Sequence, residues 1–340
     1  MKNIILLFCI VSLTLTSCQE LVFGLDYDNN PEENFESMWT EFDQLYGLFR
    51  LKKIDWDSVY QVYRPQLSTQ SSERELYNVL VDMMTLLNDS HTGLLPTNSD
   101  LPQFQSGEGG RIQQVDDFHL DIVKENYLSK PREAAPFTYE YLTDEIGYLY
   151  IAYEPGEKTI DKHMPEVLDY FKNAKSLIVD VRVNTGGEDR GGQAIASYFT
   201  DQKRLYMTSS IKNGPGRDDF TTPEEWYIEP KPIIFEGPLY LLTNRSTVSA
   251  GETLTLAMRS LPQLTMLGDT TTGAFANAIT RELPNGWLYS MSIGEWRAAD
   301  GTSYEGQGIP PDIVIQNARE VLLTGVDQAL EKALELAKNN

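Results

Sequence analysis

The sequence predicts an α/β (α+β) protein, in which an N-terminal helical subdomain precedes a mainly parallel, helix-covered sheet core. Three observations predict this class. Residues 31–93 carry apolar side chains at helical spacing, and from Ile146 onward short apolar runs alternate with helix-like runs. Tight turns containing glycine or serine follow two of these apolar runs. Strands that alternate with helices are typical of a parallel sheet covered by helices.

The helical subdomain is expected to contain three helices. Asn30 and Pro31 favour a helix start, as N-cap and first helical residue. A second helix is expected in IDWDSVYQVYRPQL. A third is expected to begin at Ser72, where Glu75 completes a capping box, and to end in NDSHTG, where Gly93 supplies a stop.

The sheet core is expected to begin at IGYLYIAY and to continue through SLIVDVRV, PLYLLTN and LTMLGD. Helices are predicted over Pro165–Phe171, GQAIASYF and GETLTLAM, and an amphipathic helix over Val321–Lys338. Hairpins are expected in ITRELPNGWLYSMSIGEWRAADG, with Asn285-Gly286 as a type I′ turn. These elements give five segments: a lipoprotein signal peptide (1–17), a tether (18–30), the helical subdomain (31–93), a connector (94–140) and the core with its C-terminal helix (141–340).

Composition narrows the class of partner. The chain has 340 residues, of which 41% are hydrophobic and 23% charged, as in globular proteins. Its formal net charge is −22, which argues against binding duplex nucleic acid because the phosphate backbone would be repelled. The sequence shows no CxxC and no histidine spacing typical of a metal site, so neither a metal nor another cofactor is expected.

The N-terminus is typical of an exported protein. Lys2 precedes the apolar stretch Ile4–Leu15, which is too short to span a bilayer comfortably. LTSC ends at Cys18 and resembles a bacterial lipobox, which predicts lipidation of Cys18 and anchoring on the periplasmic or outer face of the cell envelope. A plain secretion signal with an incidental cysteine is the alternative. The other cysteine, Cys9, would be lost with the signal, leaving no thiol nucleophile.

Ser249 is a candidate nucleophile. It lies in TNRSTVSAGE, between an expected strand and an expected helix, and ligands of open α/β sheets bind at the carboxyl ends of the strands. The N–H groups that follow it, at Ala250 and Gly251, would point at a developing anion. The alternative is that Ser249 only caps the helix, with Glu252 completing a capping box. The segment is not GxSxG, because Thr247 stands at the first glycine position.

A serine nucleophile needs a base, and His91 is the best candidate. The chain has no lysine between Lys231 and Lys332. Of the three histidines, His119 lies in an expected strand and His163 near an expected helix start, where surface or core roles are more common. His91 instead lies in the polar turn NDSHTG at a helix end, although a turn or capping role remains open.

Gly186-Gly187 is the third element of the candidate site. The pair follows the strand SLIVDVRV, where glycines permit positive φ and expose N–H groups to a ligand. A simple strand-to-helix turn is the alternative. Phosphate binding has less support, because no GxxxxGK[ST] occurs.

Several ordered motifs resemble the C-terminal processing (tail-specific) serine protease family. LIVDVRVNTGG resembles its strand and diglycine, TNRSTVSAGETL its nucleophile segment, LGDTTTGA its next strand and turn, and GQGIPPDIVI its closing strand. MWTEFDQLYGLF, IDWDSVYQVY and LLNDSHTGL resemble its helical N-terminal region. The resemblance implies a core of the tail-specific protease or ClpP-crotonase-like type. The connector is too short for the PDZ module of many members.

The resemblance also implies roles for residues. One branch uses a Ser–Lys dyad, but Ala274 stands at the lysine position here. The branch similar to the tricorn protease core uses a Ser-His-Ser-Glu tetrad. The matching residues are Ser249 as nucleophile, His91 as base, and Ser90 and Glu305 as the relay that orients it. Gly186 or Gly187, together with Ala250, would donate N–H groups to the oxyanion.

The function implied is a lipid-anchored serine endopeptidase that acts on peptides or unfolded proteins through an acyl-enzyme. Membrane contact is expected only through the N-terminal lipid, and the sequence leaves the oligomeric state open. A binding protein that keeps the fold without chemistry, with a peptide or apolar ligand, is the main alternative. An esterase or lipase is a third possibility.

Overall fold

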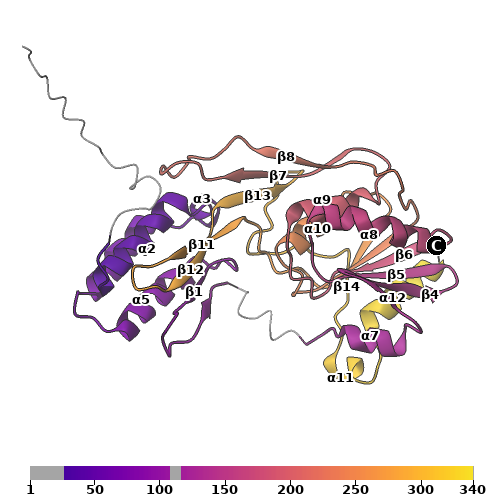
Figure 1. Cartoon of the computed structure of the whole chain (residues 1–340), viewed down its shortest axis with the longest axis horizontal. Helices are drawn as coiled ribbons and strands as arrows, with labels where there is room; N and C mark the ends of the chain where they lie inside the picture. Colours follow the sequence, from indigo (N-terminus) through magenta and orange to yellow (C-terminus); the bar gives the residue numbers. More distant parts are fainter. Residues whose placement is uncertain (1–26, 108–115, 340) are drawn as a thin grey trace, which may run out of the picture.

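The computed structural model describes residues 27–107 and 116–339. Two lobes lie side by side, with a long antiparallel sheet running between them (Figure 1). One lobe, here called the helical module, consists of helices α2 to α5 with strands β1, β2, β11 and β12. The other, here called the sheet core, contains a seven-stranded sheet and its covering helices. The signal-peptide and lipidation predictions, including Cys18, lie outside the described residues.

The helices of the module begin where capping residues predict. They are α2 (Pro31–Leu45), α3 (Phe49–Lys52), α4 (Trp56–Tyr63), the short 3₁₀ helix η1 (Arg64–Gln66) and α5 (Glu73–Thr85). The Asn30 side chain accepts the N–H of Glu33 at 3.1 Å. Ser72 and Glu75 form both bonds of the predicted capping box. Helix α3 was not among the predicted elements, because its four residues carry no side-chain cap.

A distant part of the chain completes the core of the module. Strands β1 (Gly93–Leu95) and β2 (Phe104–Gln105) pair with the hairpin β11 (Ala278–Glu282) and β12 (Leu288–Ser292), in the order β11-β12-β1-β2. Trp287, Tyr289 and Met291 are buried in one apolar cluster with Phe42 and Leu80 of the helices. The helical module therefore includes residues that lie some 200 positions further along the sequence.

The sheet core has the predicted mainly parallel sheet. Its strands run in the order β14-β10-β9-β6-β5-β4-β3, and β5, β6, β9, β10 and β14 pair in parallel. The strands are β3 (Arg132–Ala134), β4 (Phe137–Thr143), β5 (Ile146–Ile151), β6 (Ser176–Asp180), β9 (Leu239–Thr243), β10 (Leu264–Gly268) and β14 (Ile313–Val314).

Helices cover both faces of this sheet, which explains why its central strands β5, β6 and β9 are buried and mostly apolar. The helices are α7 (Leu120–Asn126), α8 (Glu157–Tyr170), α9 (Asp189–Ser197), α10 (Ala250–Arg259), α11 (Arg319–Leu322) and α12 (Gln328–Asn339). Successive residues of a strand point to opposite faces. Leu177 and Val179 of β6 accordingly pack with residues of α8, α9 and α10, whereas Ile178 packs with residues of α7 and α12.

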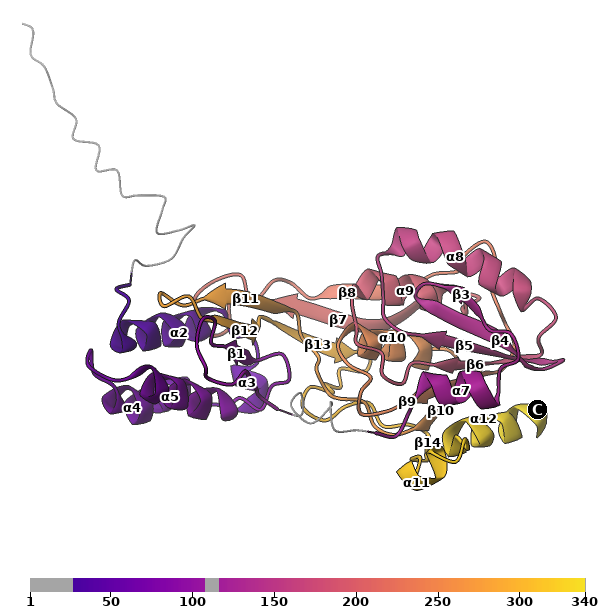
Figure 2. The same ribbon diagram turned by 60° about the horizontal axis from the view of Figure 1, so that its bottom comes forward.

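A three-stranded antiparallel sheet links the lobes. It consists of β7 (Arg204–Ile211), β8 (Glu224–Ile228) and β13 (Gly294–Ala298), in the order β13-β7-β8. Figure 2 shows these strands spanning the space between the helical module and the sheet core. Since β13 follows β12 after one residue, the chain passes directly from the module into this sheet.

Two predictions about secondary structure were wrong, one about the start of a helix and one about a strand. Helix α8 begins at Glu157, and Pro165 lies inside it. Burial of Ile160 and Met164 in the core accounts for the extra turns. His119 does not lie in a strand: it precedes α7 as its N-cap, because α7 buries Val123 under the sheet.

One turn prediction and one helix prediction were also wrong. Asn285-Gly286 does not form a type I′ turn, since only Gly286 has positive φ (87°). The turn bond runs from the Gly286 N–H to the Leu283 carbonyl, so Pro284, with its fixed negative φ, takes the second position of the turn. The expected helix over 321–338 is divided into α11 and α12 near Gly325, whose φ is 92°.

Within residues 27–107 and 116–339, no helix is both long and apolar enough to cross a bilayer.

Candidate active site

Ser249 occupies a strained turn between β9 and α10. Its φ is 57° and its ψ is −123°, a conformation that side-chain-bearing residues rarely adopt. Such strain persists only where the surroundings hold it, and it clusters at functional sites. Ser249 does stand at the N-cap position of α10, and Glu252 accepts its backbone N–H at 3.2 Å. Its hydroxyl points at a different group.

That group is His91, whose Nε2 lies 3.2 Å from the Ser249 Oγ across 158 residues of sequence. The loop after α5 fixes the main chain of His91. The Asp89 carboxylate accepts the N–H of His91 at 2.8 Å, and the carbonyl of His91 accepts the Ser290 hydroxyl at 2.7 Å. The structure therefore brings the helical module's histidine to the sheet core's serine.

The electrostatic surroundings keep this imidazole neutral. Burial lowers the pKa of His91 below its usual 6.5, while the nearby Asp89 charge opposes this effect. A neutral imidazole at neutral pH can accept the proton of Ser249 through Nε2.

The other ring nitrogen is less well held. His91 Nδ1 is buried and has no hydrogen-bond partner within the described residues. In that same part of the chain, the Ser90 hydroxyl and the Glu305 carboxylate form no hydrogen bond to this nitrogen. The structure thus brings two of the four predicted tetrad residues into contact and leaves the other two unconnected to the ring.

Glu305 is buried and has a different partner. One oxygen accepts the N–H of Phe275 at 2.7 Å, and the other lies 2.9 Å from the ammonium of Lys52 on α3. Burial and the charge of Asp89 raise the pKa of Glu305 to about 8, whereas Lys52 opposes this rise. Lys52 also donates to the Asn88 carbonyl at 2.8 Å, three residues before His91. Sequence reasoning missed Lys52, which lies in a helix without capping signals.

The candidate oxyanion donors lie beside Ser249. Gly186 and Gly187 have φ of 80° and 153°. A Cβ on Gly186 would come within 2.9 Å of the Ser249 Cβ, so glycine permits this close approach of the two loops. The Gly186 N–H is already donated to the Asn184 side chain at 2.9 Å. Within the described residues, the N–H groups of Gly187 and Ala250 have no acceptor, which leaves them available to a ligand.

Glu252 ties the nucleophile loop to the turn that follows β10. The fully buried carboxylate accepts the Thr271 hydroxyl at 2.6 Å and the N–H groups of Gly273 and Ala274 at 2.7 Å each, besides that of Ser249. Burial raises the pKa of Glu252 to about 7, and these bonds oppose the rise. Only the capping role of Glu252 could be predicted from the sequence, because the other partners of this carboxylate come from another loop.

The described residues contain no cluster of three or more histidine, cysteine, aspartate or glutamate side chains arranged to hold an ion. The arrangement of a hydroxyl, a neutral imidazole and two free N–H groups is instead that of nucleophilic catalysis.

Comparison with known proteins agrees with this chemistry. The model of peptidase family S41 matches residues 145–315, which is half of the chain. The chain belongs to peptidase family S41. The model of the tricorn protease C1 domain matches residues 27–85 of this S41 chain, so both lobes match a family model. The predicted family resemblance, including its relation to the tricorn protease, is confirmed.

Individual relatives support the same grouping. This S41 chain is 29% identical to the tricorn protease of Thermoplasma volcanium over 64% of its length and 20% of that protein's. It is 26% identical to the carboxy-terminal processing protease CtpA of Bacillus subtilis, over 55% of this chain and 39% of that one. The chain thus spans well under half the length of these two relatives.

Solved structures extend the likeness to the whole fold. A protein from Parabacteroides merdae, described provisionally as a peptidase, is 31% identical with a TM-score of 0.80, covering 91% of this chain and 97% of that one. A lipoprotein from Streptococcus agalactiae shares the fold at 17% identity, with a TM-score of 0.57 over 93% of this S41 chain and 98% of that one. The predicted fold class is confirmed.

Proposed function

We propose that this S41 chain is a serine endopeptidase that cleaves peptide bonds through an acyl-enzyme. The observation that carries the proposal is the 3.2 Å contact between Ser249 Oγ and His91 Nε2. The serine is held at positive φ, and burial lowers the pKa of the imidazole, which favours its neutral form. As Oγ attacks the carbonyl carbon of the peptide, His91 takes the hydroxyl proton. His91 then gives that proton to the leaving amine, and Ser249 keeps the acyl group as an ester.

The second half of the reaction reverses these roles. A water molecule gives a proton to His91 and attacks the ester, and the acid product leaves as Oγ recovers its proton. In both steps the carbonyl oxygen becomes an oxyanion, to which Gly187 and Ala250 donate their free N–H groups. Loss of one such donor typically slows an acyl-transfer enzyme about 10²–10³-fold.

Ser90 and Glu305 complete the proposal as residues that orient His91 through Nδ1. Support comes from the family resemblance and from the burial of Glu305 beside Asp89 and Lys52. Catalytic hydrogen bonds are often incomplete before substrate binds. The substrate class proposed is an extended peptide or an unfolded protein. We also propose anchoring through a lipid on Cys18, since the N-terminus resembles a lipobox and one fold neighbour is a lipoprotein.

Substitution of the nucleophile tests the function. Ser249→Ala should abolish cleavage of a quenched fluorescent peptide and labelling by a fluorophosphonate, with the melting temperature kept. Ser197→Ala is the matched control, because that buried hydroxyl bonds a carbonyl within α9 and lies outside the site. Full turnover by Ser249→Ala contradicts the assignment. If the wild type binds peptide but is not labelled by the fluorophosphonate, the alternative of a binding protein without catalytic activity is supported. Cleavage of esters but not of amides supports an esterase.

A further inference from the structure

The two oxyanion donors come from different loops, which raises the question of what aligns them. Gly187 lies in the loop after β6, and Ala250 follows the loop after β9. Strands β6 and β9 are parallel neighbours, so both loops leave the same edge of the sheet. Catalytic groups must be held to within about 0.5 Å of the productive geometry, and backbone loops reach this only when other groups fix them.

Asn184 fixes the first loop and reaches into the second. Its buried amide donates to the Ile151 carbonyl at 3.1 Å and to the Glu154 carboxyl at 2.7 Å. Its side-chain oxygen accepts the Gly186 N–H, which leaves Gly187 as the free donor of the diglycine. The main-chain carbonyl of Asn184 accepts the N–H of Val248, next to the nucleophile, at 3.1 Å.

Asn244 fixes the second loop and bonds to the first. Its side-chain oxygen accepts the N–H of Ser246 in its own loop at 3.0 Å and that of Val183 in the first loop at 3.2 Å. Its amide donates to Asp117 at 2.8 Å, and the residue is 1% exposed. Each asparagine thus bonds its own loop and the facing one, so neither loop can shift alone.

The first loop carries strain that these bonds hold. Val183 has φ of 59°, although its side chain is branched at Cβ, and it follows directly on Arg182. This backbone region is unfavourable for an L-residue, because its Cβ comes too close to the following carbonyl oxygen. The N–H bond to Asn244 fixes one side of Val183, and the Asn184 N–H bond to the Val181 carbonyl closes the turn on the other.

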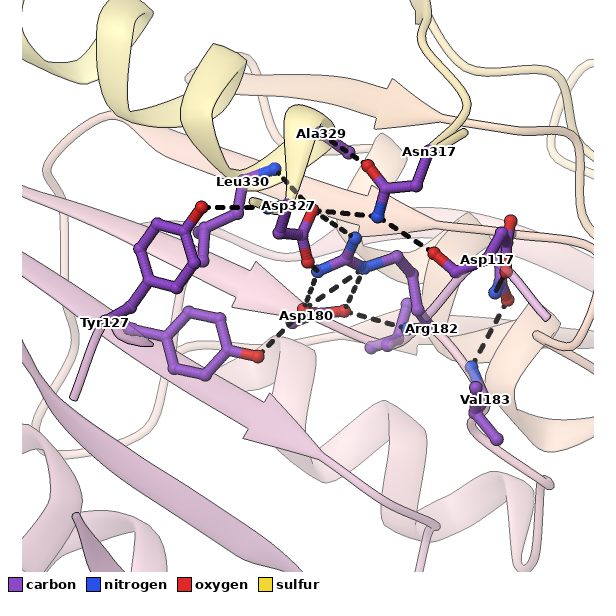
Figure 3. Close-up of polar contacts among 12 residues, drawn as sticks. Asp117, Tyr127, Asp180, Arg182, Val183, Asn317, Asp327, Ala329 and Leu330 are labelled. Carbon is purple, nitrogen blue, oxygen red and sulfur yellow. Dashed lines mark hydrogen bonds and ion pairs between the residues drawn. The ribbon is translucent and has the colours of Figure 1, made fainter. Parts of the chain in front are cut away.

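Behind the strained turn lies a buried network that Figure 3 shows. Arg182 is buried between Asp180 of β6 and Asp327 at the start of α12, with contacts of 2.6 and 2.9 Å from one guanidinium nitrogen. Asn317 bonds both Asp327 and the carbonyl of Asp117. The acceptor of Asn244 is therefore itself held by the C-terminal part of the chain.

On these contacts we propose that Asn184 and Asn244 form a pair of positioning residues that holds the N–H groups of Gly187 and Ala250 in register for the oxyanion. The proposal rests on the proposed peptidase function and adds the residues that align its donors. Neither asparagine touches the reacting atoms. Their removal should therefore weaken stabilisation of the tetrahedral state and leave binding of the extended substrate largely unchanged.

Asn184→Asp is the sharpest test. The variant keeps the oxygen that accepts from Gly186 but turns a second oxygen toward the Glu154 carboxyl and the Ile151 carbonyl, which displaces the loop. We expect kcat to fall about 10²-fold with KM within threefold, because a misplacement of about 1 Å can cost that factor. Affinity for a peptide boronic acid, which forms a tetrahedral adduct on serine, should fall by the same factor as kcat/KM.

Asn34→Asp is the matched control. Asn34 is equally buried and bonds the Asn30 carbonyl and the Asn285 N–H, but it lies in the helical module away from both loops. This control should lower the melting temperature and leave kcat on the folded fraction unchanged. Asn244→Ala, which removes the acceptor for Val183 and Ser246, and Asn184→Ser, which adds no charge, provide the same readout if Asn184→Asp does not fold.

The outcomes separate this proposal from the function on which it rests. An active wild type whose asparagine variants keep kcat within threefold contradicts the positioning role alone. A fall in kcat without a matching fall in boronic acid affinity also contradicts it. A wild type that neither cleaves peptides nor binds the boronic acid contradicts the peptidase function, and the positioning role with it.

Discussion

The two halves of the candidate site differ in how firmly they are held. On the sheet-core side, Ser249 and the donor loop are fixed by Glu252, Asn184 and Asn244, which together bond several main-chain groups. On the helical-module side, the His91 main chain is fixed, but its ring contacts Ser249 through Nε2 while Nδ1 has no partner in the described part of the chain. This difference shows that the position of the His91 ring relative to Ser249 depends on how the helical module packs against the sheet core.

Backbone strain follows the same division. The sheet-core side keeps Ser249 and Val183 at positive φ, where side-chain-bearing residues are costly. The loop that carries His91 has positive φ at Asn88, a residue type that tolerates this region well. Between the loop of His91 and the two loops of the sheet-core side, the more strained ones are thus those with more hydrogen bonds to hold them.

Of the substitutions that test this difference, removal of the base His91 should lower activity most. His91→Ala should lower kcat about 10⁴-fold or more, as for base removal in other serine hydrolases. Fluorophosphonate labelling of Ser249 should fall in parallel, while the melting temperature changes little, because the ring contributes few bonds. His163→Ala, on α8, is the control and should match the wild type. An activity of His91→Ala above a hundredth of the wild type would show that another group serves as base.

Loss of the Glu252 carboxylate on the sheet-core side should cause the next largest fall in activity. Glu252→Gln turns an amide NH₂ toward the N–H groups of Gly273, Ala274 or Ser249, so the nucleophile loop should relax. We expect kcat to fall about 10²-fold and the free energy of unfolding by about 1–3 kcal/mol, since a buried donor loses its acceptor. Glu140→Gln is the control. Glu140 lies on β4 and accepts the Lys130 N–H and the Ser129 hydroxyl, so this variant also removes an acceptor of backbone and hydroxyl donors. Comparable loss of activity in both variants would mean that stability alone is measured.

On the helical-module side, Lys52 should matter less. Lys52→Met leaves Glu305 buried without its cation and frees the Asn88 carbonyl, so His91 should be less well placed. We expect about a tenfold fall in kcat. In a double-mutant cycle with Glu305→Gln, the two effects should be less than additive, because the residues act as a pair. Full additivity in kcat would contradict coupling between Lys52 and Glu305.

The smallest expected effect is a shift in the pH profile. Activity requires neutral His91, and burial lowers its pKa, so kcat/KM should rise with pH through a midpoint below 6.5. The same shift affects stability. The unfolded chain binds a proton at His91 more readily than the folded chain does, so the free energy of unfolding should decrease as pH falls below about 6.5. Profiles of kcat/KM and of urea unfolding from pH 5 to 8 measure both. A midpoint above 6.5 would indicate that a carboxylate charge dominates at the ring.

The sequence predicted features that depend on local signals and missed those that depend on contacts between distant elements. Mostly apolar runs predicted β5, β6 and β9, and capping residues predicted the starts of α2 and α5, because these signals are local. The contact of His91 with Ser249 was expected from family resemblance, since no local pattern spans 158 residues. Lys52, Asn184 and Asn244 were missed, because their partners come from other elements of the fold. Strands β7 and β8 were not predicted either, and both are only partly buried.

The hairpin of β11 and β12 determines when during synthesis the helical module can fold completely. Trp287, Tyr289 and Met291 fill the interior of the lobe that presents His91, and β12 pairs with β1, just beyond that histidine. A growing chain that has released only its first hundred or so residues lacks this apolar filling, so its early helices have no complete interior to pack around. The lobe that presents His91 can therefore complete its interior only after residues 287–291 have left the ribosome.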